Sequence, residues 1–367
     1  MTNISNYGYA GNPNDNTWTG TFSTDNELFL RIFGGEVLAA YEKAIEVSPR
    51  IMQRTISAGK SVQFPIHGRA LARHHVPGQD ILDKTNKSTN TYVDASGDGT
   101  GAGRPIAYQA SDVPYLSNLG AEQKTILIND LMLASVFIDD LEEAKAHYDL
   151  RSTYTSELGK ALARRADNLS VRALVGAASG TGVGPLRGGQ AVYDANMAVQ
   201  ADVAASSIIG AIQKLDEFDV PTDERFCVLP PSMYYLLLRA AGGIGPDQSY
   251  AALLSRDYSM GNGDFAEGRV LMVAGCPVIV TNNGGFGIDM STAEDGQYNT
   301  ELRVNMANIV GVVAHKSAAG MAKLKDLQVE SEYMIQNQGN LFVAKMAAGI
   351  APLRTDAAVN LIKTAAP

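Results

Sequence analysis

The stretch from Asp139 to Ala178 constrains the fold of this chain more than any other part of its sequence, because it contains no proline and shows a helical pattern. Acidic residues crowd its start and basic residues favour its end, which matches the helix dipole. A continuous helix of this length would span roughly 55–60 Å at about 1.5 Å per residue. That is longer than a compact domain requires, so we expect the helix to serve as a spine. The apolar stripe that predicts it consists of Leu141, Ala144, Tyr148, Leu158, Leu162, Ala166, Leu169 and Ala173, interrupted by Arg151 and Thr155.

An extended arm is predicted at the start of the sequence. Residues 1–25 are rich in Asn, Gly and Thr and show no periodicity, which is typical of a segment without a core of its own. Asp25 is expected to cap a helix over residues 26–46, which Gly34 and Gly35 interrupt. Each glycine inside a helix costs about 1 kcal/mol, so we expect a bend or close packing there.

A long loop is predicted between this helix and the spine helix. Residues 62–66 and 124–128 alternate in the manner of strands. The chain between them is a polar excursion, and its residues 94–103 are too rich in glycine and aspartate to pack a core. We therefore expect the two strands to form the base of a protruding hairpin-like loop.

The sequence after the spine helix predicts a separate lobe that mixes helices and strands. Glycines at residues 180–190 break the chain, and residues 191–315 then read as an α/β lobe. Residues 307–354 alternate again and predict several strands that end before Pro352. The elements expected in the lobe are a helix at 204–218, a strand at 225–229, a helix at 231–241 and a strand at 277–281.

Composition excludes several classes of protein. The net charge of -9 argues against a basic nucleic-acid-binding surface. Cys227 and Cys276 are the two cysteines, and their wide spacing predicts neither a disulfide framework nor a metal site but a reducing compartment. The polar N-terminal residues lack the features of a signal peptide. The sequence contains no run of 18 apolar residues, so it predicts no membrane-spanning helix.

The motif Gly59-Lys60-Ser61 invites the hypothesis of a phosphate-binding loop. That loop needs a second glycine five residues before the first, where this chain has Arg54. It also opens a helix, whereas the residues after Lys60 alternate as a strand does. The hypothesis of a phosphate-binding loop therefore fails, and the stretch needs another role.

No other motif predicts an active site. The histidines at 67, 74 and 75 match no metal-ligand spacing, and the acidic residues at 139, 140, 142 and 143 are expected at a helix start without catalysis. Residues 94–103 lack the closing glutamate of an EF-hand, and residues 180–185 follow a helix rather than the strand of a dinucleotide site. His147 and His315 each stand alone, and neither cysteine lies in a nucleophile motif. The prediction is no catalytic, cofactor-binding or metal-binding residue.

Three blocks of the sequence resemble the major capsid protein of T-seven-like short-tailed bacteriophages, and they occur in the same order. They are "LFLRIFGGEVLAAYEKAIEVSPRIMQRTISAGKSVQFPIHGR", "DDLEEAKAHYDLRSTYTSELGKALA" and "NIVGVVAHKSAAGMAKLKDL". The resemblance extends over most of residues 27–355 and is weakest from 190 to 300. It implies the Hong Kong 97-type capsid fold, of class α+β, in which arm and loop reach across neighbouring subunits. It also implies that the stretch around Gly59-Lys60-Ser61 is the hinge from the arm to the extended loop. Residues 86–121 make the loop longer than the resemblance implies.

The resemblance also implies a division of the chain and a role. Expected parts are residues 1–58 as the N-terminal arm, 59–128 as the extended loop, 129–185 with 316–355 as the peripheral domain carrying the spine helix, and 186–315 as the α/β axial domain. The implied role is structural and not enzymatic: a major capsid subunit forming pentamers and hexamers of an icosahedral shell around phage double-stranded DNA. The implied partners are copies of the chain, a scaffolding protein, a portal and non-specifically bound DNA, with no membrane and no cofactor. The implied location is the virion, after assembly in the cytoplasm of a bacterial host.

Two alternatives stay open at this point. An encapsulin-like nanocompartment shell would share the fold but enclose enzyme cargo instead of DNA. A nucleotide-dependent enzyme would use Lys60 and Ser61, and the absence of ATP binding would remove it.

Overall fold

The computed structural model describes residues 36–67, 121–128, 131–139, 141, 145, 150–181, 188–241, 272–292 and 299–364. The chain divides into two compact units, and each takes up several separate segments. Unit 1 comprises Met1–Ile45, Leu131–Ala166 and Lys325–Ala347. Unit 2 comprises Glu46–Asp130, Asp167–Leu324 and Ala348–Pro367. Residues 1–35, which include the extended arm predicted at 1–25, and residues 68–120, which hold most of the predicted excursion, lie outside the described residues.

Three long strands of a four-stranded sheet run through unit 1. Strands β4 (Leu131–Asp139), β10 (Ala319–Met334) and β11 (Gly339–Pro352) are neighbours in the order β10-β11-β4. Strand β11 pairs with β4 in the antiparallel sense, with Leu341 opposite Phe137. The two strands bury one face of their paired segment through Met132, Ile138, Phe342, Ala344 and Met346.

Helical residues 36–44 pack inside unit 1. The Tyr41 hydroxyl donates a hydrogen bond to Met346 Sδ on the buried face of the sheet, at 3.5 Å. Gly159 lies so close to these residues that a Cβ added there would stand 2.4 Å from the Val37 carbonyl oxygen. A glycine in the middle of helix α3 (Leu150–Ser179) therefore allows the two helices to touch through their backbones.

Helix α3 confirms most of the predicted spine helix. Its 30 residues cover the second, longer part of the predicted stretch. Leu141 and Lys145 are helical too, so helical structure begins directly after Asp139. Asp139 itself ends strand β4, and its Oδ1 accepts a hydrogen bond from the Leu141 backbone N–H at 2.7 Å. The stripe residues Leu158, Leu162, Ala166, Leu169 and Ala173 are all buried, as the pattern predicted. Thr155, which interrupts the stripe, is buried too, and it donates a hydrogen bond to Glu36 Oε2.

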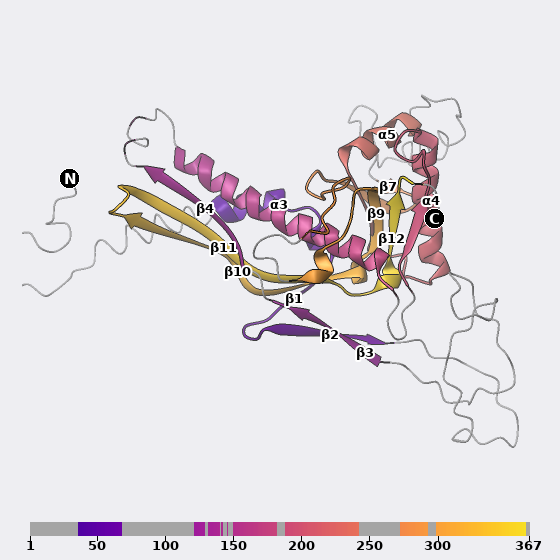
Figure 1. The fold of residues 1–367 in the computed structure, drawn as a ribbon, viewed down its shortest axis with the longest axis horizontal. Helices are drawn as coiled ribbons and strands as arrows, with labels where there is room; N and C mark the ends of the chain where they lie inside the picture. The colour runs from indigo at the N-terminus through magenta and orange to yellow at the C-terminus, as the bar shows by residue number, and fades with distance from the viewer. Residues whose placement is uncertain are drawn as a thin grey trace, which may run out of the picture. The chain divides into compact units, whose positions relative to one another are not determined.

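Unit 2 is built around a sheet of six strands in the order β5-β12-β9-β6-β8-β7. Figure 1 shows β9 and β12 side by side in this sheet, and helix α4 packs against β12. The bounds are β5 (Gln190–Tyr193), α4 (Ala201–Glu217), β6 (Arg225–Leu229), α5 (Pro231–Ala241), β7 (Met272–Val273), β8 (Cys276–Val280), β9 (Ile309–His315) and β12 (Ala358–Ile362). Four of these, α4, β6, α5 and β8, confirm the elements predicted for the lobe.

Strand β12 corrects the prediction that the strands end before Pro352. Strand β11 includes Pro352, and the later strand β12 inserts between β5 and β9, outside the range predicted for the lobe. Its five residues are too few to show a period, and Asn360 interrupts their apolar run. The NH₂ group of the buried Asn360 donates hydrogen bonds to the Val175 carbonyl and to Ser179 Oγ of α3.

The remaining elements of unit 2 are short. Strand β1 (Met52–Thr55) pairs in parallel with the start of β10. Strands β2 (Ser61–His67) and β3 (Ala121–Leu127) pair in the antiparallel sense, which confirms the predicted base of the loop. The 3-10 turns are η2 (Ser48–Arg50), η4 (Thr300–Leu302), η5 (Lys316–Ala318) and η6 (Thr355–Ala357). In the described part of the chain, no helix is both long and apolar enough to cross a membrane.

Candidate functional site

The β2–β3 hairpin is anchored by an apolar cluster in unit 2, which we call the loop root. Alternation along both strands turns Val62, Phe64 and Ile126 to the same side, where all three are buried. The other buried members are Ile128, Ala322, Ala351 and Leu353, and the half-buried Ile56 and Leu324 pack against them. The loop root thus ties the hairpin to the start of β10 and the end of β11.

Two glycines allow the hairpin to approach these strands closely. A Cβ added at Gly349 would stand 2.3 Å from the Leu127 carbonyl oxygen. A Cβ added at Gly320 would stand 2.6 Å from Leu353 Cδ1 and 3.0 Å from Ile126 Cδ1. At Gly349 the obstacle is backbone, which has no rotamer by which to move aside. The β2–β3 hairpin can therefore pack this closely against β10 and β11 only because residues 320 and 349 are glycines.

Polar contacts add to the apolar anchoring of the loop root. Lys124 Nζ of β3 lies 2.5 Å from Glu301 Oε1 in η4, and both side chains are partly exposed. The Ile128 backbone N–H donates to the Lys60 carbonyl at 2.8 Å. Lys60 is exposed, and Gly59 before it has a φ of 122°. The motif Gly59-Lys60-Ser61 accordingly forms a turn into a strand, as the alternation after Lys60 predicted.

A second anchor in unit 2, which we call the arm root, consists of residues 46–48 held by Asp167 of α3. Asp167 Oδ2 accepts the Glu46 N–H at 2.9 Å. Asp167 Oδ1 accepts the N–H groups of Val47 and Ser48 at 3.1 and 3.0 Å, and the Ser48 hydroxyl at 3.1 Å. The Ser48 and Ser170 hydroxyl oxygens are 2.8 Å apart. Asp167, Val47, Ser48 and Ser170 are fully buried, at 0% exposure.

The arm root carries two carboxyl groups with perturbed acidity. Burial raises the pKa of Asp167, and the hydrogen bonds it accepts oppose that shift without cancelling it. Burial also raises the pKa of Glu46, with a further contribution from the negative charge of Asp167 and an opposing hydrogen bond from the Thr281 side chain. The two carboxylates therefore destabilise each other when both are ionised.

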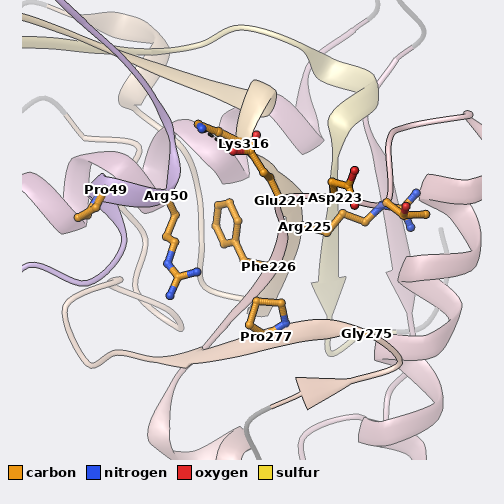
Figure 2. A pocket seen from close by; sticks show the side chains of 10 residues that line it. Pro49, Arg50, Asp223, Glu224, Arg225, Phe226, Gly275, Pro277 and Lys316 are labelled. Carbon is orange, nitrogen blue, oxygen red and sulfur yellow. Dashed lines mark hydrogen bonds and ion pairs between the residues drawn. The ribbon is translucent and has the colours of Figure 1, made fainter.

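A polar hollow of about 420 Å³ lies elsewhere in unit 2, and Figure 2 shows the side chains that line it. Arg225 at its wall is fully engaged: Nη1 pairs with Asp216 Oδ1 at 2.7 Å, and its other nitrogens donate to the carbonyls of Val220 and Pro221. Lys316 pairs with Glu224 at 2.6 Å. These charges stabilise the turn before β6, whose Glu224 has a φ of 57°. We assign the hollow a structural role.

The other sequence candidates do not come together. Cys227 and Cys276 are buried, and burial raises the pKa of both thiols, which keeps them protonated and unreactive. His315 Nδ1 is 2.8 Å from Ser317 Oγ, and burial lowers its pKa. His67 ends β2, while His74, His75 and His147 lie outside the described residues. Within the described ranges, no three His, Cys, Asp or Glu side chains are placed to hold a metal ion.

Known proteins resemble this chain along most of its length. The family model Gp10A-like, described as major capsid protein, matches residues 104–362. The major capsid protein of Enterobacteria phage T3 is 31% identical over 363 residues, which cover 91% of each chain. That of Escherichia phage T7 is 30% identical over 355 residues, or 90% of each. The chain belongs to this family of phage major capsid proteins.

The fold of this capsid protein agrees with the family. The solved capsid structure of cyanophage P-SCSP1u matches it with a TM-score of 0.65 and 28% identity, over 86% of this chain and 87% of that one. The predicted Hong Kong 97-type fold, of class α+β, is confirmed. So is the predicted role as the structural subunit of an icosahedral phage shell, in preference to an encapsulin-like compartment.

For a capsid protein the relevant sites are surfaces that meet other subunits, and unit 1 exposes one clear candidate. Leu131, Leu133 and Phe137 lie on one face of β4 and are 55, 56 and 40% exposed. We call these three side chains the apolar face. Sequence reasoning missed it because β4 is apolar on both faces, a pattern that is typical of a strand buried on both sides.

Proposed function

We propose that this capsid protein assembles into pentamers and hexamers of a closed shell around packaged double-stranded phage DNA, and that it catalyses no reaction. The observation that carries the proposal is the apolar face of β4. Exposed clusters of large apolar side chains are rare on soluble monomers and are typical of surfaces that bind other proteins. In a shell subunit the natural cover for such a face is another copy of the same chain.

The further partners follow from this role. We infer that a scaffolding protein and a portal ring direct assembly in the cytoplasm of the bacterial host, and that the finished shell is part of the virion. Packaged DNA is expected to meet the wall without sequence preference. The net charge of -9 supports a wall that holds DNA weakly, because strong binding to DNA needs many basic groups.

The absence of catalysis is supported by the state of the candidate groups. Lys60 sits on an exposed turn that leads into a strand, where no helix N-terminus could bind a phosphate. Both cysteines are buried thiols with raised pKa values. We expect no ATP binding by calorimetry, and Lys60→Ala should leave shell formation unchanged. Micromolar binding of ATP that Lys60→Ala abolishes would contradict the proposal.

Co-expression with the scaffold, followed by negative-stain electron microscopy, tests the proposed assembly. The wild-type protein should give closed shells of uniform diameter. Leu133→Glu should give folded subunits but few shells, because Leu133 is exposed in the subunit and a charge there opposes burial against a neighbour. Val199→Glu, at an apolar residue that is 75% exposed in unit 2, is the matched control and should assemble. Normal shells from Leu133→Glu would remove the apolar face from the assembly surface.

A further inference from the structure

The four-stranded sheet has two outer edges that no described strand covers. Strand β4 has β11 on one side and, among the described residues, no strand on the other. Strand β10 has β1 beside residues 320–323 only, so its residues 324–334 have no described neighbour on that side. An edge strand presents unpaired backbone N–H and C=O groups, which can pair with an exposed strand of another molecule. Natural proteins therefore protect such edges with charges, prolines or bulges.

The edge at β10 is protected in this way, and the edge at β4 is not. The charged residues within 324–334 of β10 are all exposed, and they are Lys325, Asp326, Glu330 and Glu332. Strand β4 has no proline, and it has no charged residue before Asp139, its last residue. Its register with β11 runs from Leu131 to Asp139 without a bulge. A long apolar edge of this kind invites aggregation unless it is paired, so we expect a strand beside β4 in the assembled protein.

We propose that the partner of β4 is β4 of a second copy of this chain, paired in the antiparallel sense across a two-fold axis. The inference rests on the proposed function, and it adds one specific contact between subunits of the shell. A two-fold contact uses the same edge on both subunits, so it closes on itself and leaves no apolar edge open. An icosahedral shell contains two-fold axes, so a contact of this kind has a place in it. The edge at β10 is a poor partner for β4, because its charges would lie beside apolar side chains.

The sequence of β4 is complementary to itself in this arrangement. Full overlap of the nine-residue strand places the axis at Ser135, its middle residue. Residues directly opposite each other in an antiparallel pair have their side chains on the same face. The opposed pairs are then Met132 with Ile138, Ala134 with Val136, and Leu133 with Phe137. The first two pairs extend the buried face of the sheet, and the third joins the apolar faces of the two copies. The charged Asp139 lies at the end of the overlap, where water reaches it.

A charge at residue 135 tests the two-fold axis, because this residue would meet its own copy. In Ser135→Lys, like charges would lie directly opposite each other and weaken each contact by up to about fivefold. Every subunit makes such a contact, so the yield of closed shells on co-expression with the scaffold should fall by at least about fivefold. Ser135→Glu should have the same effect. Equal co-expression of the two variants should restore the yield, because lysine can then face glutamate.

Cross-linking provides a direct measure of the proposed distance. The Cβ atoms of opposite residues in an antiparallel pair are only about 4.5–5.5 Å apart. A short bis-maleimide reagent should therefore convert Ser135→Cys shells into covalent dimers on a denaturing gel. The native Cys227 and Cys276 are buried and contribute no background. Ser331, an exposed serine of β10, is the matched control: Ser331→Cys should stay monomeric, and Ser331→Lys should assemble as the wild type does.

The proposal requires both results, namely rescue by mixing the charged variants and dimers from Ser135→Cys. Normal shells from Ser135→Lys alone would overturn it. Loss of shells without rescue, or shells of Ser135→Cys that give no dimer, would overturn it as well, since a different strand would then cover β4. Failure of the wild-type protein to form any shell would instead overturn the proposed function. Cross-linking of the soluble Ser135→Cys protein would still decide in that case whether two copies of β4 pair.

Discussion

The loop root and the arm root anchor different parts of the same unit by opposite means. At the loop root, seven buried apolar residues pack together, and two glycines let the backbones touch. At the arm root, one buried carboxylate collects four hydrogen bonds. Apolar burial is strong and non-directional, while hydrogen bonds are directional and depend on charge. We therefore expect the stability contributed by the loop root to be independent of pH. The stability contributed by the arm root should change when its carboxylate gains or loses a proton.

The largest effect is expected from Gly349→Ala at the loop root. The added Cβ would overlap the Leu127 carbonyl, so the hairpin must shift or the strand must distort. We expect a loss of about 3 kcal/mol or more in the free energy of unfolding, measured by urea denaturation. Gly210→Ala in α4 is the matched control, because a Cβ there meets nothing within 4 Å. It should stabilise the protein by up to about 1 kcal/mol. A Gly349→Ala protein as stable as the wild type would show that the hairpin base is not tightly packed.

Phe64→Ala should have the next largest effect. Phe64 is 6% exposed in the loop root, and removing a buried aromatic ring leaves a cavity. The expected loss is about 3 kcal/mol in the free energy of unfolding. Gln63→Ala, at an exposed neighbour on the other face of β2, should change it by less than about 0.5 kcal/mol. Similar values for the two variants would indicate that the loop root is solvated.

The pH dependence of stability should distinguish the two roots. The pKa values of Asp167 and Glu46 are both raised, so these groups favour the folded state below their ordinary pKa values, 3.8 and 4.5. That contribution is lost as the pH rises through the raised pKa values. The wild type should therefore lose stability relative to Asp167→Asn as the pH rises from about 4 to 7.

Denaturation curves across this pH range provide the measurement. The difference between the wild type and Phe64→Ala serves as the control, because the apolar cluster of the loop root contains no titratable group. That difference should stay constant with pH. A wild type that gains stability over Asp167→Asn as the pH rises would show that the hydrogen bonds outweigh burial, contrary to the raised pKa.

The smallest effect is expected from the ion pair at the edge of the loop root. The Lys124 and Glu301 side chains are 33 and 40% exposed, so water and salt screen their attraction. A double-mutant cycle with Lys124→Ala and Glu301→Ala should give a coupling below about 1 kcal/mol. The coupling should fall further in 1 M NaCl (Debye length about 3 Å). A larger, salt-independent coupling would mean that this pair, and not the apolar cluster, sets the position of the hairpin.

Much of the fold followed from local patterns. The sequence predicted the buried stripe of α3, the alternation in β2 and β3, and the bounds of β6 and α5. It could do so because apolar periodicity and helix-breaking residues act over a few neighbouring positions. The three collinear blocks also carried enough identity to predict the family. The predicted helix start fell on Asp139, which ends strand β4 directly before the helical residue Leu141, since acidic residues suit both the end of a strand and the start of a helix.

The sequence by itself determined most of the helices and strands, because that choice depends on the periodicity of nearby apolar residues. Only the tertiary structure decided which distant segments meet. It inserted β12 between β5 and β9 in the large sheet, brought Gly349 against Leu127, and turned Asp167 toward residues 46–48. Nothing local marks these three features, because a buried aspartate or an indispensable glycine has the same sequence neighbours as an ordinary one. Their roles come from contacts between residues far apart in the chain, which only the folded backbone creates.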